Sequence, residues 1–126
     1  MGYDLSARIC LGVQLYDETA DYSLDDVIVN GKTPEDWYEI AKFIECASPF
    51  SGKVGALRCG WEGENGIVLA IKDTIYTVDW GEVKNLNSLL TFQEEQWKIV
   101  FELRDYLIKC GITPLDQGIL LSAYYG

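Results

Sequence analysis

A strictly alternating segment near the start of the chain is the strongest constraint on its fold. The residues at every second position from 6 to 14 are polar or small. Side chains of an extended strand alternate between two faces, so this pattern predicts a long strand with one face on a core and a wetter opposite face. Apolar side chains fill the alternate positions, at Leu5, Ala7, Ile9, Leu11, Val13 and Leu15.

Two later segments have the end signals and apolar spacing of helices. The first is expected to begin at Thr33 and Pro34, a capping residue followed by a proline at the first helical position, and to end near Cys46. The second is expected to follow Thr91, which starts a capping-box pattern, and to stop at Gly111.

The remaining strands are marked by β-branched and aromatic residues. The segments 67–71 and 74–80 are predicted to form a hairpin that turns at Lys72 and Asp73. The order of elements predicts one α+β domain over residues 1–126, with two helices packed on one side of an antiparallel or mixed sheet. Strands are expected over 27–29, 54–59, 67–71, 74–80 and 119–125.

The composition restricts what the chain could bind. It has 20 acidic and 10 basic residues, a net charge of -10, which disfavours contact with nucleic acid or an anionic membrane surface. No apolar run approaches the roughly 20 residues that cross a bilayer. Scattered cysteines without a C-x-x-C pair fit reduced thiols, and the first residues do not resemble a signal peptide. We therefore expect a cytoplasmic protein.

The acidic residues are concentrated between Asp17 and Glu45. Nine acids in this stretch face only Lys32 and Lys42, which gives a local net charge of -7. Tyrosines lie among them, as at binding hot spots, where aromatic anchors stand beside charges. The alternative is a solvated loop and helix face whose aromatic residues belong to the core. The candidate partner-binding residues are Asp17, Glu18, Asp21, Tyr22, Asp25, Asp26, Glu35, Asp36 and Glu39.

Familiar catalytic patterns are missing. The chain has no histidine, which removes Ser-His-Asp and Cys-His nucleophile systems. The cysteines do not have zinc-site spacing, and the early aspartates do not have calcium-loop spacing. We therefore predict no catalytic residue, no metal and no cofactor. One exception stays open, a carboxylate pair formed by Asp79 and Glu82.

The second half of the chain also carries a resemblance. It lies in the segment 79–87 (DWGEVKNLN), in the helix that begins before Trp97, and in the ending 118–126 (GILLSAYYG). Through these, residues 66–126 resemble small uncharacterised proteins of tailed bacteriophages. The resemblance implies a viral gene product that works inside a bacterium and has no active site. Small acidic phage proteins include anti-restriction and anti-CRISPR inhibitors, some of which look like nucleic acid to their targets.

These observations predict a non-enzymatic, phage-type protein that inhibits or modulates a host protein. The expected target is a nucleic-acid-handling defence factor with a basic surface, in the cytoplasm of the bacterial host. Neither nucleic acid nor a membrane is expected to contact the chain directly. Two alternatives stay open. One is a small carboxylate-based enzyme, and the other is a structural or assembly protein that forms a homodimer or larger homo-oligomer through its strands.

Overall fold

The computed structural model describes residues 5–17, 24–87 and 91–125, which form two helices and a five-stranded mixed sheet. This arrangement confirms the predicted α+β fold. In chain order the elements are β1 (Leu5–Asp17), η1 (Leu24–Asp26), α1 (Trp37–Cys46), β2 (Val54–Trp61), β3 (Gly66–Ile71), η2 (Lys72–Thr74), β4 (Tyr76–Asp79), α2 (Glu94–Lys109) and β5 (Asp116–Tyr125).

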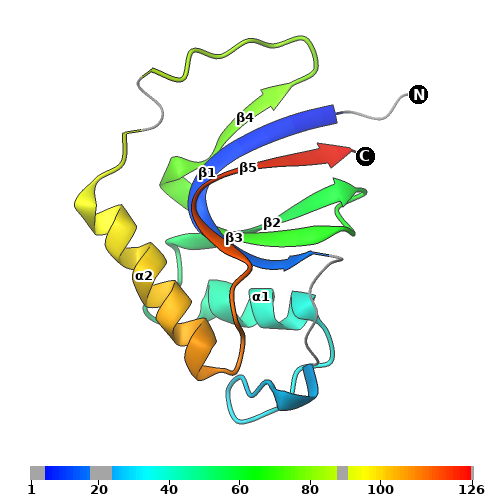
Figure 1. Cartoon of the computed structure of the whole chain (residues 1–126), viewed down its shortest axis with the longest axis vertical. Helices are drawn as coiled ribbons and strands as arrows, with labels where there is room; N and C mark the ends of the chain where they lie inside the picture. The colour runs from blue at the N-terminus through cyan, green and yellow to red at the C-terminus, as the bar shows by residue number, and fades with distance from the viewer. Residues whose placement is uncertain (1–4, 18–23, 88–90, 126) are drawn as a thin grey trace.

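Strand β1 is the centre of the sheet, because it pairs antiparallel with three other strands. Along one edge it pairs with β5, from Leu5↔Tyr125 to Gln14↔Asp116. Its other edge is divided between two strands, with β4 along residues 6–9 and β3 along residues 12–17. In Figure 1, β1 curls strongly over its length, and the other strands follow this curve.

The pairings close into a ring. Strand β3 pairs antiparallel with β2, and the end of β2 pairs parallel with the end of β5 through Gly60↔Tyr124 and Trp61↔Tyr125. Among the described residues, β2 and β5 pair only at this corner of the ring. Over residues 116–123 the same edge of β5 has no strand partner among the described residues.

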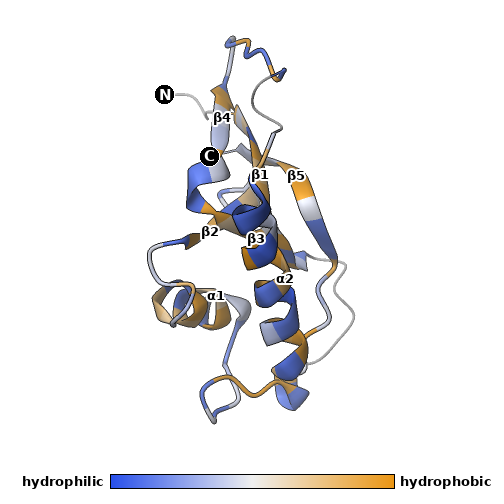
Figure 2. Ribbon diagram, turned by 90° about the vertical axis from the view of Figure 1, so that its left-hand side faces the viewer, coloured by the Kyte–Doolittle hydropathy of each residue, from blue (hydrophilic) through white to orange (hydrophobic). Residues whose placement is uncertain are grey.

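Both helices cover the same face of the sheet, as predicted. They lie together on one side of the strands in Figures 1 and 2. Their buried residues and the apolar residues of β1 belong to one core cluster, which also takes in β2 and β3. From the helices this cluster contains Ile40, Ala41, Ile44, Val100, Leu103 and Leu107, and from β1 it contains Leu11, Val13 and Leu15.

The opposite face of β1 is more buried than the alternation of polar and apolar residues predicts. Cys10 is buried there in a second cluster with Val68 and Ala70, and half-buried side chains from β2 and β5 pack against it. The reason is the ring of strands, because curvature turns this face of the sheet toward itself. A strand pattern shows how one strand is buried but does not show that the sheet closes.

The predicted hairpin over residues 67–80 is wrong. Strands β3 and β4 do not pair with each other, because η2 redirects the chain and both strands pair with β1, one after the other. Thr74, which is 1% exposed, bridges the junction. Its hydroxyl accepts a hydrogen bond from the Leu11 N–H at 2.9 Å and donates to the Ile71 carbonyl at 2.7 Å.

Element ends also differ from the sequence predictions. Helix α1 is capped by Asp36, and the predicted cap Thr33 lies upstream of the helix. Helix α2 has its capping box at Gln93 and Gln96 and does not use Thr91. In both cases a second polar residue closer to the apolar stripe supplies the cap. The predicted strand over 27–29 is reduced to one bridge, Val29↔Lys32.

Replacing Thr74 with valine is expected to destabilise the fold by about 1–3 kcal/mol, because it leaves the buried Leu11 N–H without an acceptor while keeping the side-chain shape. Thr74→Ser keeps the hydroxyl and is the matched control. The measurement is the free energy of unfolding in urea. Equal stability of the valine and serine variants would show that the hydroxyl does not support this junction.

Replacing Gly12 with alanine is expected to cost about 1–3 kcal/mol, because the new methyl group would press on the Leu69 carbonyl of β3. Gly55→Ala is the control, since its methyl would meet only the flexible Lys72 side chain, at 3.3 Å. Unfolding midpoints in denaturant compare the two variants. If the Gly12 variant is as stable as the Gly55 variant, the contact between β1 and β3 is looser than described.

Candidate functional site

Three elements converge at one end of the molecule, on the right of Figure 1: the end of β1, the start of α1 and the turn between β2 and β3. The Tyr16 ring stacks on Trp37 with centroids 5.2 Å apart, which ties β1 to α1. The Tyr38 hydroxyl donates a hydrogen bond to the Gly63 carbonyl at 3.2 Å, which ties α1 to the turn. These contacts fix the relative positions of the charged residues nearby.

This end of the molecule carries a concentration of carboxylates. Most of them are exposed, and Asp17 is half-buried. The ion pairs Lys98–Glu102 and Arg104–Asp105 lie on α2 and do not involve this end. Among the described residues, none of the five carboxylates other than Asp17 forms an ion pair. The acidic end, as we call it, consists of Asp17, Glu35, Asp36, Glu39, Glu62 and Glu64.

The structure brings together only part of the predicted binding residues. Asp17, Glu35, Asp36 and Glu39 belong to the acidic end. Two others are placed elsewhere. Asp25 and Asp26 are exposed on η1, which lies beside the end of α2, where the Ile28 N–H donates to the Cys110 carbonyl at 3.0 Å. The remaining candidates Glu18, Asp21 and Tyr22 lie outside the described residues.

Glu62 and Glu64 lie in the turn between β2 and β3 and are not among the predicted binding residues. They join the acidic end because Gly63 between them is buried against α1, and because Gly66 pairs with Asp17 in the sheet register. Glycines at this spacing do indicate a tight turn. The contact with α1, however, is made by residues 25 positions apart, and no local pattern reports it.

Two of these acids also build the start of α1. The Asp36 Oδ1 atom accepts the Glu39 N–H at 2.8 Å, and Glu39 Oε2 accepts the Glu35 N–H at 2.8 Å. This reciprocal arrangement satisfies amides that have no partner inside the helix. Negative charge is favoured there by the helix dipole. The local fold therefore stabilises part of the acidic end.

An exposed arginine of β2 contacts the first turn of α1 at the acidic end. The Arg58 guanidinium lies 4.2 Å from the centre of the Tyr38 ring, within the range of a cation–π contact. Tyr38 thus has a hydrogen bond at its hydroxyl and a cation against its ring. This double contact holds the first turn of α1 against the β2–β3 turn.

Burial disfavours the thiolate form of two of the four cysteines. Burial, with a smaller contribution from the nearby Cys59, raises the pKa of Cys10 to about 11. Burial also raises the pKa of Cys110. The deprotonated form of a thiol is the nucleophile, so these shifts disfavour nucleophilic chemistry by both groups at neutral pH. Cys46 is exposed on the last turn of α1.

The carboxylate pair Asp79 and Glu82 forms a turn. Both residues are exposed, the Asp79 N–H donates to the Glu82 carboxylate at 2.9 Å, and the Glu82 N–H donates to the Asp79 carbonyl at 3.0 Å. Glu82 thus closes a loop at the end of β4. This geometry lends no support to the two carboxyl groups facing each other across a substrate.

Comparison with known proteins gave no relative: no family model, no curated protein and no solved structure matches this chain. Within the described ranges, neither helix is long and apolar enough to cross a membrane. The same part of the chain contains no group of three or more cysteines and carboxylates placed to hold a metal ion.

Two substitutions at Asp36 separate its role as the cap of α1 from the effect of its negative charge. Asp36→Ala should lower stability by about 1 kcal/mol, because the Glu39 N–H loses its acceptor. Asp36→Asn should keep stability, because the amide oxygen still accepts that bond. Thermal unfolding measures both. A stable alanine variant would show that Asp36 does not cap the helix.

Proposed function

We propose that the chain is a non-enzymatic, phage-type inhibitor or modulator of a bacterial nucleic-acid-handling protein. It acts by placing its acidic end against a basic surface of that protein. The observation that carries the proposal is that three elements bearing six carboxylates meet through the Tyr16–Trp37 stack, the Tyr38–Gly63 hydrogen bond and the pairing of Asp17 with Gly66.

The physical basis is electrostatic complementarity. Surfaces that bind nucleic acid are rich in lysine and arginine, which are spaced to contact phosphates. Carboxylates held on a folded scaffold present acceptors to the same side chains, and opposite charge steers the encounter. Glu35, Glu62 and Glu64 have no ion pair among the described residues, so their charge is available to a partner.

Two further observations support a binding protein over a catalyst. The chain has no histidine, and burial leaves Cys10 and Cys110 protonated. The resemblance of residues 66–126 to small phage proteins supports the viral and inhibitory part of the proposal. Cytoplasmic action in the host follows from that same resemblance.

Charge reversal at the acidic end tests the proposal. The variant Glu35→Lys, Glu62→Lys, Glu64→Lys leaves the capping residues Asp36 and Glu39 in place. In affinity capture from a bacterial lysate, the unaltered chain is expected to retain a nucleic-acid-handling protein at low salt. The variant should retain about tenfold less, because several favourable charge contacts become repulsive. The complex should also weaken at about 0.5 M salt, where screening is strong.

The matched control reverses three exposed acids away from the acidic end, Asp73, Asp79 and Glu95. It changes the net charge by the same amount and should capture the partner as the unaltered chain does. Equal capture by both variants would contradict the proposal, and so would a partner that does not handle nucleic acid.

A further inference from the structure

A hollow of about 370 Å³ lies between the segment 29–34 and α1. Its walls come from Val29, Asn30, Lys32 and Pro34 on one side, and from Glu39, Ile40, Lys42, Phe43 and Cys46 on the other. It is separate from the Tyr16–Trp37 stack on which the acidic end is built. The size falls in the range of pockets that hold small organic molecules, about 300–1,000 Å³.

The inner surface of this hollow is apolar. Val29 and Ile40 are 7% and 0% exposed, Pro34 is buried, and Phe43 is half-buried beside them. These side chains belong to the main core or pack against it, so they form a firm surface. Phe43 still has exposed apolar surface, and an apolar group that covers it would release water, which is favourable.

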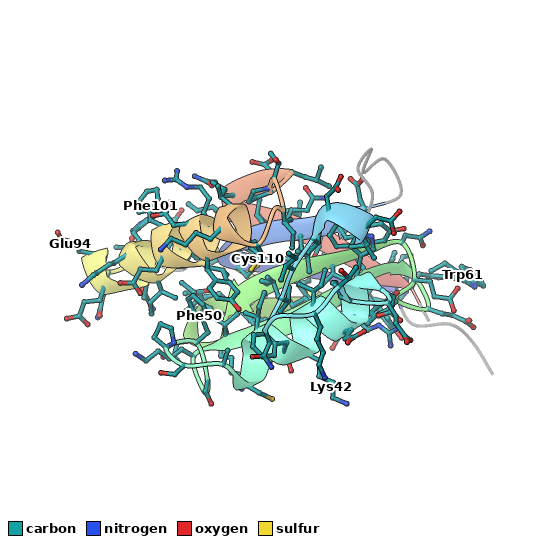
Figure 3. All side chains as sticks on the ribbon, turned by 90° about the horizontal axis from the view of Figure 1, so that it is seen from below. Lys42, Phe50, Trp61, Glu94, Phe101 and Cys110 are labelled. Atoms are coloured by element: carbon teal, nitrogen blue, oxygen red, sulfur yellow. The ribbon has the colours of Figure 1, made fainter. Side chains whose placement is uncertain are left out.

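The rim carries positive charge that is not neutralised by an ion pair. Lys32 and Lys42 are the two basic residues of the stretch 17–45, and both line the hollow. Neither forms an ion pair among the described residues, although nine acids surround them in the sequence. Figure 3 shows the Lys42 side chain extending away from α1.

One carboxylate, Glu39, also lines the hollow and must be weighed against the lysines. Its Oε2 atom accepts the Glu35 N–H at 2.8 Å, which holds the carboxylate at the start of the helix. More distant acids act weakly at physiological salt, where the screening length is about 8 Å. The rim therefore carries two lysine ammonium groups and one carboxylate, and a hydrogen bond already holds that carboxylate at the start of the helix.

We propose that this hollow binds a small amphipathic organic anion. Its apolar body would lie against Phe43, over the floor that Val29 and Ile40 form, and its carboxylate, sulfonate or phosphate group would face Lys32 and Lys42. Apolar contact supplies most of the affinity, and the two ammonium groups select for negative charge. The site shares Glu39 with the acidic end, but its apolar surface and its two lysines are not part of that end, so the chain would have a second binding function whether or not the proposed partner is found.

The probe for this site is anilinonaphthalene sulfonate, an aromatic anion whose fluorescence rises in apolar surroundings. The unaltered chain is expected to bind it with saturation at one molecule per chain. The variant Lys32→Met, Lys42→Met should bind it about three- to tenfold more weakly, because two charge contacts are lost. Methionine is more apolar than lysine, so purely hydrophobic binding would instead become tighter.

Two control measurements show whether a change in the affinity for anilinonaphthalene sulfonate comes from the loss of the two charges. Lys53→Met, Lys84→Met removes two exposed lysines elsewhere and should leave the affinity unchanged. Nile red, a neutral apolar dye, should bind to the Lys32, Lys42 variant at least as tightly as to the unaltered chain. If the methionine pair changes the circular dichroism spectrum, Lys32→Gln, Lys42→Gln replaces it with the same expectation. Anilinonaphthalene sulfonate binding as tight as that of the unaltered chain in the folded variant overturns the proposal.

Cys46 locates the bound probe. It lines the hollow and is exposed, whereas Cys10 and Cys110 are buried. Saturating anilinonaphthalene sulfonate should slow the reaction of Cys46 with a thiol reagent, and prior alkylation of Cys46 should weaken probe binding. An unchanged reaction rate together with unchanged affinity after alkylation would place the probe elsewhere and contradict the assignment.

Discussion

The hydrogen bonding of β1 is the constraint on which the rest of the structure depends. This strand pairs with β5 on one edge and with β4 and β3 on the other, so three of the other four strands are positioned by it. Its middle is buried on both faces, by the helices on one side and by the second cluster on the other. A change in the register of β1 would expose one of these clusters and break all three pairings.

The acidic end is a direct product of that arrangement. Because β1 ends at Asp17 beside Gly66, the chain brings a carboxylate to the β2–β3 turn. The Tyr16 ring then provides the surface on which Trp37 of α1 packs. Aromatic packing holds together the elements that bear these charges, and helix capping fixes Asp36 at the start of α1. The contacts that stabilise this part of the fold thus also position the charges that are proposed to bind a partner.

The sequence predicted the elements better than their partners. Alternation identified β1, and apolar spacing identified the buried side of α1. Pairing could not be predicted, because β3 and β4 follow each other closely in sequence yet meet through β1. At the candidate site, local patterns found Glu35 and Asp36 but missed Glu62, whose position depends on the tertiary contact between Tyr38 and Gly63. Local patterns report propensity and burial, whereas such contacts depend on the whole chain.

Part of one edge of β5 has no strand partner among the described residues, and this affects how the protein behaves in concentrated solution. Free strand edges recruit other chains, and Ile119 and Leu121 are 45% and 73% exposed on this strand. Residues 117–126 contain no charge, so the edge itself does not repel another chain. Its protection comes from the net charge of the whole molecule, which acts as a colloidal stabiliser. Near pH 4.3, where the sequence carries about no net charge, that repulsion vanishes and the edge of β5 loses this protection.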